Sequence, residues 1–151
     1  MKNILIFLVL LTFTKIALSQ EQFPVFTSEA LVKSDSTILL KKGEYKVIVY
    51  GAIGCSYSRY LIDHLYAIDT CEKLEIIIVL NDPKDAISTE YPELIKKYSV
   101  YTNDILKYRL KKDNTITPQT FLFKNNEQLL HVKGVKKNMF VKIKDYVKCT
   151  N

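Results

Sequence analysis

The sequence predicts an α/β domain in which a mixed central β-sheet is flanked by helices. Two short apolar runs, residues 46–50 and 74–80, are rich in valine and isoleucine and are typical of buried strands. Between the two runs, apolar residues recur at the spacing of one helical face: Leu61, Ile62, Leu65 and Ile68. This alternation of strand and helix is the layout of an α/β domain.

The last third of the sequence predicts a β-hairpin followed by a closing helix. Residues 120–123 form a short apolar strand, residues 124–127 a tight turn, and residues 128–135 the returning strand. The last helix is expected over residues 137–148. Its apolar face is made of Met139, Phe140, Ile143, Tyr146 and Val147. Because the hairpin is antiparallel, the predicted sheet is mixed.

A less regular helical region is expected between these two halves, over residues 90–110. The apolar pattern is interrupted around residues 98–103, so we expect a break in the helix there. Thr102 or Asn103 has the side-chain oxygen needed to cap the second part. The sequence therefore predicts a broken helix in this connection.

The N-terminal residues 1–19 are predicted to be a signal peptide. Met1-Lys2-Asn3 is a short basic start, an apolar run follows, and small residues precede the expected cleavage before Gln20. An apolar run of about ten residues is too short for a transmembrane helix, which needs about 20. A membrane anchor is the alternative. We therefore expect one domain over residues 20–151, periplasmic or secreted, with no stable membrane insertion after cleavage.

Charge and composition favour neither a nucleic-acid partner nor a metal site. The formal net charge is +6, but much of the excess lies in six lysines between residues 133 and 148, which are typical of the solvated face of a helix. His64 and His131 lack ligand partners at useful spacing, so no metal is expected. No cofactor is implied by any motif.

Cys55 is the candidate chemical residue, because it lies where the first strand gives way to a helix. At a helix start, unpaired backbone N–H groups and the helix dipole stabilise a thiolate, which is the nucleophile in disulfide exchange. Ser58 lies one helical turn further on, so its hydroxyl could donate to the sulfur. The alternative is that Cys55 is a small buried side chain at a strand–helix junction. Its position alone does not decide between the two.

Two segments of the sequence resemble the thioredoxin superfamily. In residues 47–65, Cys55 to Ser58 stand where that family has its Cys-x-x-Cys motif, and residues 116–134 are similar to its cis-proline strand and hairpin. The sequence resembles in particular the exported bacterial proteins of the redoxin type. The resemblance implies a thioredoxin-like fold. It also implies a cis Thr117-Pro118 peptide beside Cys55 that presents backbone groups to a bound peptide. Separately, Tyr57 is expected to flank the thiol as an exposed ring that a peptide substrate could touch.

The sequence departs from that pattern at the second cysteine, which is replaced by Ser58. A serine hydroxyl cannot attack a mixed disulfide, so Cys55 would act alone. We therefore expect thiol–disulfide exchange, as in a monothiol oxidoreductase or isomerase, with a cysteine-containing protein or peptide and an external thiol reductant. The main alternative is a non-catalytic thioredoxin-like binding module. A third is a homodimer linked through Cys55.

The other two cysteines, Cys71 and Cys149, are expected to form a disulfide. An odd number of cysteines in an exported chain suggests one disulfide and one free thiol. In a thioredoxin-like arrangement, the helices that end near Cys71 and Cys149 cover the same face of the sheet and run in the same direction. The resemblance thus implies a Cys71–Cys149 pair, with Cys55 free.

Overall fold

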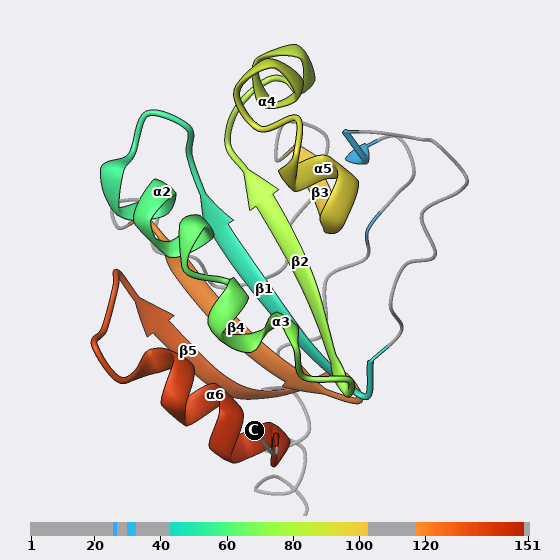
Figure 1. The fold of residues 1–151 in the computed structure, drawn as a ribbon, viewed down its shortest axis with the longest axis vertical. Coiled ribbons are helices and arrows are strands. Elements are labelled where there is room, and N and C mark those ends of the chain that lie inside the picture. The colour runs from blue at the N-terminus through green and yellow to red at the C-terminus, as the bar shows by residue number, and fades with distance from the viewer. Residues whose placement is uncertain (1–25, 27–29, 33–42, 103–116, 150–151) are drawn as a thin grey trace, which may run out of the picture.

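The computed structural model describes residues 26, 30–32, 43–102 and 117–149. A five-stranded sheet forms its centre, with the strand order β3-β2-β1-β4-β5 (Figure 1). The strands are β1 (Tyr45–Gly51), β2 (Leu74–Leu80), β3 (Ser99–Thr102), β4 (Gln119–Lys124) and β5 (Glu127–Lys133). β2 is parallel to both β1 and β3, whereas β4 is antiparallel to both β1 and β5. The predicted α/β fold with a mixed sheet is therefore confirmed.

The helices pack mainly on one face of this sheet, where the larger hydrophobic core lies. They are α2 (Ser56–Asp63), α3 (Tyr66–Asp69), α4 (Lys84–Glu90), α5 (Leu94–Lys97) and α6 (Met139–Val147). Figure 1 shows α2, α3 and α6 in front of the sheet. Alternate residues of β1 divide between two cores: Val47 and Val49 face the helices, while Ile48 and Tyr50 face the opposite side. None of the described helices has the length and apolar character to cross a membrane.

The helix expected between β1 and β2 is present, but it is divided into α2 and α3. Its four predicted apolar residues are all buried in the core. At the division, the N–H groups of His64 and Leu65 donate to the carbonyl oxygens of Leu61 and Ile62, both at 3.2 Å. These are bonds to the third preceding residue, which tighten the turn. The tight turn lets the chain change direction while the apolar face stays on the sheet.

The connection after β2 differs from the prediction. A helix, α4, already begins at Lys84, and residues 99–102 form strand β3 where an interruption between two helical parts was expected. These residues pair in parallel with Ile77–Leu80 of β2. On the other side, the N–H of Val32 donates to the carbonyl oxygen of Val100 at 2.9 Å. Residues 99–102 therefore form a strand because they have hydrogen-bonded partners on both sides. The predicted second part of the helix, residues 103–110, lies outside the described residues.

The hairpin forms as predicted, with slightly different ends. Asn125 and Asn126 both have positive φ angles, 48° and 71°, which asparagine tolerates better than most residues. β5 begins at Glu127 and ends at Lys133, two residues before the predicted end. A β-bulge interrupts its pairing with β4.

The last helix, α6, buries three of the five residues predicted for its apolar face. Met139, Ile143 and Val147 are buried against the sheet. Phe140 is partly buried beside them, whereas Tyr146 is 45% exposed, so it does not belong to the buried face of α6. The buried residues are four positions apart, which aligns them on one stripe of the helix. Tyr146 lies at the edge of that stripe, where its ring reaches solvent.

Candidate thiol site

Cys55 lies at the N-cap of α2, after a short turn that follows β1. Its backbone is extended, with φ −95° and ψ 113°. Its N–H donates to the carbonyl oxygen of Ala52 at 3.2 Å, and its own carbonyl accepts the N–H of Arg59 at 3.0 Å. The thiol therefore sits against the first turn of an eight-residue helix, where backbone N–H groups point toward it.

The environment of Cys55 changes the acidity of its thiol. Burial raises the pKa, because it disfavours the charged form. Hydrogen bonds from the Ser58 side chain and from the backbone N–H groups of Ser58 and Tyr57 lower it, and the pKa is lower than the ordinary value overall. Because Cys55 is still partly exposed, a thiolate formed there is open to a reaction partner.

Ser58 is fully buried beneath the thiol, and its hydroxyl has a second role in the backbone. Its oxygen accepts a hydrogen bond from the N–H of Ala52 at 3.2 Å. A Cβ atom added to Gly51 would come within 2.9 Å of the same oxygen, so the end of β1 and Ser58 are in close contact. Ser58 thus links the turn to the helix and is shielded from solvent.

The Thr117-Pro118 segment lies beside Cys55. Its peptide bond is cis, as the resemblance implied. The Cys55 thiol donates to the carbonyl oxygen of Thr117 at a sulfur–oxygen distance of 3.6 Å. The carbonyl of Pro118 accepts the N–H of Gly134 at 2.8 Å, which ties this segment to the end of β5. The structure therefore brings together Cys55, Ser58, Thr117 and Pro118.

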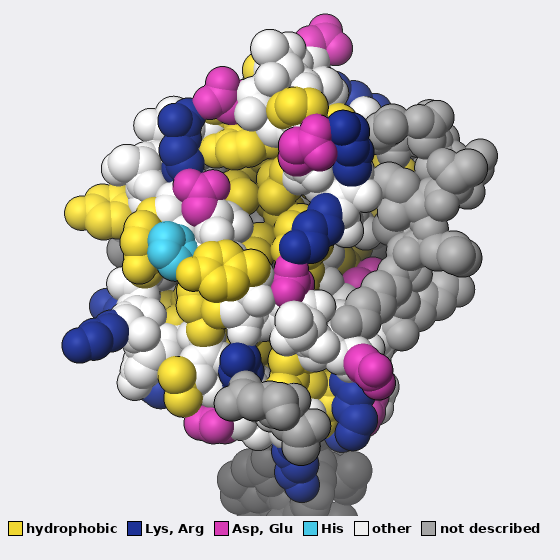
Figure 2. Space-filling model, viewed as in Figure 1, with side chains coloured by type: hydrophobic (Ala, Val, Ile, Leu, Met, Phe, Trp, Pro, Cys, Tyr) yellow, Lys and Arg dark blue, Asp and Glu magenta, His cyan; other side chains and the backbone are white. Residues whose placement is uncertain are grey.

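Aromatic side chains are exposed on the helices next to the thiol. Tyr57 is 65% exposed, and Tyr60 and Tyr66 are also largely exposed. Figure 2 shows hydrophobic side chains at the surface of the face that α2 and α3 cover. Arg59 forms an ion pair with Glu90 of α4 at 2.5 Å. The ring of Tyr57 is thus open to solvent, while the charge of Arg59 is paired.

The two histidines lie apart from each other and take part in separate contacts. His64 stacks on Tyr60, with ring centroids 4.1 Å apart, and its Nδ1 is 2.7 Å from the Tyr60 carbonyl oxygen. His131 of β5 stacks on Phe121 at 4.2 Å, and its Nε2 lies 2.9 Å from the side-chain oxygen of Gln119. Within the described residues, no group of three potential metal ligands occurs.

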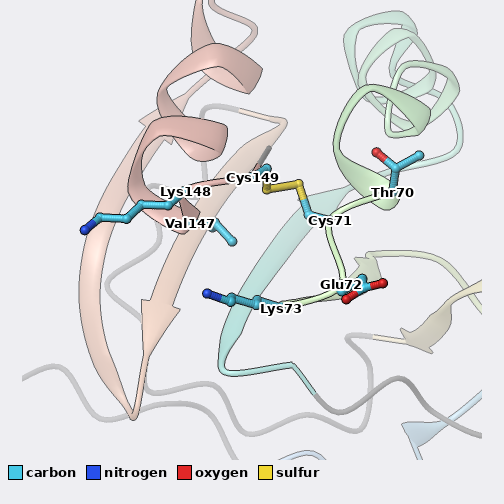
Figure 3. Close-up of a pocket in the computed structure, with 7 residues that line it drawn as sticks. All are labelled: Thr70, Cys71, Glu72, Lys73, Val147, Lys148 and Cys149. Carbon is cyan, nitrogen blue, oxygen red and sulfur yellow. A yellow bond between two sulfur atoms is a disulfide. The ribbon is translucent and has the colours of Figure 1, made fainter. Parts of the chain in front are cut away.

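Cys71 and Cys149 form a disulfide, as expected from the resemblance, and Cys55 is free. The bond joins the residues after α3 and α6 and borders a shallow pocket (Figure 3). Cys71 precedes β2, whose first residue pairs with the first residue of β1, whereas Cys55 follows the opposite end of β1. A seven-residue strand spans about 20 Å. The disulfide therefore lies too far away to exchange directly with Cys55.

Asp82 is a residue of the site that the sequence analysis did not single out. Its carboxylate accepts the backbone N–H of Ile53, in the turn before Cys55, at 2.8 Å. Its position just after a predicted buried strand could have indicated that it belongs to the site. Residues that follow neighbouring parallel strands meet at the same edge of a sheet.

Comparisons with known proteins identify the fold. No family model and no curated protein matches the chain by sequence. A thiol-disulfide oxidoreductase from Bacteroides fragilis is similar in structure, with a TM-score of 0.59, 11% identity, and coverage of 85% of this chain and 98% of that one. A thioredoxin-like protein in its oxidised form gives a TM-score of 0.62 and 14% identity, with coverage of 87% and 98%.

A third similar structure is a secreted disulfide oxidoreductase of Mycobacterium tuberculosis, described as homologous to Escherichia coli DsbE. Its TM-score is 0.57 at 11% identity, and the alignment covers 85% of this chain and 96% of that one. At identities of 11–14%, these similarities concern the fold. The structure of this chain is therefore a thioredoxin-like fold.

Proposed function

We propose that this protein takes part in thiol–disulfide exchange through the single thiol of Cys55. The observation that carries the proposal is the placement of this thiol. It lies at the start of α2 and 3.6 Å from the Thr117 carbonyl oxygen, it is partly exposed, and its pKa is lowered. A lowered pKa increases the fraction of the thiol that is in the reactive thiolate form at a given pH. The similarity to structures named thiol-disulfide oxidoreductases supports the same function.

The exchange proceeds in two steps that conserve electrons. The Cys55 thiolate attacks one sulfur of a disulfide in a protein or peptide substrate. The new bond joins Cys55 to that sulfur, and the other substrate sulfur leaves as a thiolate. An external thiol, as its thiolate, then attacks the substrate sulfur of the mixed disulfide. Cys55 leaves as a thiolate, and the external thiol and the substrate remain joined by a disulfide.

The need for an external thiol follows from the remaining cysteines. The chain has three, and Cys71 and Cys149 are joined to each other at the other end of the sheet. Ser58 occupies the position from which a second thiol would attack, but it is buried, and a hydroxyl is a poor nucleophile toward sulfur. The mixed disulfide at Cys55 is thus expected to persist until another molecule resolves it.

The residues around Cys55 have distinct proposed roles. Ser58 stabilises the thiolate by a hydrogen bond. Thr117 and Pro118 present backbone groups beside the sulfur, where an extended substrate segment would lie. Tyr57 offers an exposed ring to the same segment. Each of these contacts would orient a disulfide toward the thiolate.

We also propose that residues 1–19 are a signal peptide and that the domain over residues 20–151 acts in the periplasm or outside the cell. The Cys71–Cys149 disulfide supports this location, because structural disulfides persist in oxidising compartments. A similar structure described as a secreted oxidoreductase agrees with it.

A second candidate function is that of a non-catalytic thioredoxin-like binding module. The observation that favours it is the buried Ser58, whose hydroxyl also binds the N–H of Ala52 as a structural residue would. In such a module the surface beside Thr117 would bind a partner without exchange at Cys55. The two functions differ in whether the Cys55 thiol reacts.

The test is the pH dependence of Cys55 alkylation, together with trapping of mixed disulfides, in the protein with its disulfide intact. We expect the alkylation midpoint to lie below the ordinary thiol value of about 8.5. We also expect a disulfide-containing peptide to form an adduct that Cys55→Ser abolishes. A midpoint at or above the ordinary value, with no adduct, would contradict the exchange function and favour the binding module.

A further inference from the structure

Asp82 joins the end of one strand to the turn that precedes Cys55. It follows β2 by one intervening residue, Asn81, whose N–H donates to the carbonyl oxygen of Gly51 at 2.9 Å. This bond places the ends of β1 and β2 side by side. From there the Asp82 carboxylate oxygen Oδ2 accepts the N–H of Ile53 at 2.8 Å. A hydrogen bond to a charged acceptor is stronger than one between neutral groups.

The backbone of Asp82 is itself held by neighbouring elements. Its carbonyl oxygen accepts a hydrogen bond from the hydroxyl of Thr102, at the end of β3, at 2.8 Å. Pro83 follows it directly and is the N-cap of α4, with φ −61°. Asp82 is thus fixed between β2, β3 and α4. Its carboxylate is a rigid point to which the turn before Cys55 is attached.

Three backbone N–H groups of this turn, those of Ala52, Ile53 and Cys55, donate hydrogen bonds. The N–H of Ala52 donates to Ser58, and the N–H of Cys55 donates to Ala52, so both bonds lie within the segment 52–59. The third, from Ile53 to Asp82, connects that segment to the end of β2. Without it, the turn and the first residues of α2 would be held to each other but less firmly to the sheet.

We infer that Asp82 is a positioning residue, whose carboxylate fixes the turn so that the first N–H groups of α2 face the Cys55 sulfur. The inference rests on the proposed reactivity of Cys55. The N–H groups of Tyr57 and Ser58 lower the pKa of this thiol only when they point toward it. A turn that shifts by a fraction of an ångström weakens these contacts, because hydrogen bonds depend steeply on geometry.

An anchoring role of Asp82 and an effect of its charge would change the reactivity of the thiol in opposite directions. A nearby negative charge disfavours a thiolate, so removing the charge alone would favour it. Removing the anchor would disfavour the thiolate. Asp82→Asn removes the charge and keeps an oxygen acceptor, whereas Asp82→Ala removes both. The two variants therefore separate positioning from charge.

The experiment measures the rate of Cys55 alkylation as a function of pH in the wild type and three variants. We expect Asp82→Ala to react about threefold or more slowly at neutral pH, with a higher midpoint, as the loss of one positioning hydrogen bond predicts. Asp82→Asn should react at the wild-type rate or slightly faster. Asp85→Ala, which removes a carboxylate from the exposed first turn of α4, is the matched control and should change nothing.

Equal alkylation rates in Asp82→Ala and the wild type would overturn the inference. So would faster alkylation in both Asp82→Ala and Asp82→Asn, or slower alkylation by the same factor in both. Folding is checked by thermal unfolding. If Asp82→Ala does not fold, Thr102→Val is tested in the same assay. This variant removes the hydrogen bond from the Thr102 hydroxyl to the Asp82 carbonyl oxygen, so it should also slow alkylation. A wild-type midpoint that is not lowered contradicts the exchange function. If the wild-type midpoint is lowered and Asp82→Ala does not raise it, only the positioning role of Asp82 is contradicted.

Discussion

The thiol of Cys55 and the carbonyl oxygen of Thr117 lie 3.6 Å apart, although 62 positions separate them in the sequence. The sheet produces this contact. β1 and β4 are antiparallel neighbours, and Tyr50 at the end of β1 pairs with Gln119 at the start of β4. The residues that follow β1 and the residues that precede β4 therefore meet at the same edge of the sheet. The candidate site is built from two segments that only the sheet brings together.

The first prediction concerns Ser58, whose hydroxyl serves both the thiol and the backbone. Ser58→Ala should raise the pKa of Cys55, because a hydrogen bond to the thiolate is lost. It should also lower the free energy of unfolding by about 1 kcal/mol, since the N–H of Ala52 loses its acceptor. Alkylation against pH and denaturant unfolding measure the two effects. Ser56→Ala, at an exposed position in the same helix, should show neither.

The second prediction follows from the lowered pKa of Cys55. A thiol whose pKa is lower in the folded than in the unfolded protein stabilises the fold at pH values above its unfolded pKa. This contribution is lost as the pH falls through the folded pKa. The free energy of unfolding of the wild type, relative to Cys55→Ser, should therefore rise between pH 5 and pH 9. A difference that stays constant over this range would argue against a lowered pKa.

The third prediction separates the disulfide from the thiol site. Cys71 and Cys149 are 78 positions apart, so the chain-entropy model predicts a stabilisation of about 4.5 kcal/mol. Cys71→Ala combined with Cys149→Ala should lower the free energy of unfolding by up to that amount. The alkylation profile of Cys55 should not change, because the disulfide lies at the other end of β1. A changed alkylation profile would show that α6 and the disulfide that holds it influence the reactivity of Cys55.

The fourth prediction concerns the turn between β4 and β5. Asn126 has a φ of 71°, a region that glycine enters without steric cost. Asn126→Gly should therefore raise the free energy of unfolding by about 0.5 kcal/mol, since Asn-Gly is the preferred pair for such turns. Asn126→Val should lower it, because a β-branched side chain is strained at positive φ. Thermal unfolding of the three proteins checks the order.

Residues with a strong local preference could be assigned from the sequence. The bounds predicted for β2 agree with the structure, because seven consecutive residues rich in isoleucine suit a strand that is covered on both faces. Cys55 could be placed at a helix start, since the glycine-containing residues 51–54 follow the apolar run of residues 46–50. The pairing of Cys71 with Cys149 needed the fold as well, because spacing alone leaves the connectivity open.

The sequence by itself determined the central strands, the helix that begins after Cys55 and the hairpin, because apolar periodicity and turn residues act over a few neighbouring positions. The tertiary structure decided the rest. Residues 99–102 are a strand because Ile77–Leu80 pairs with them. Asp82 reaches Ile53, and Thr117 reaches Cys55, because the sheet aligns the ends of separate strands. Contacts of this kind depend on distances in space, which local preferences along the chain do not specify.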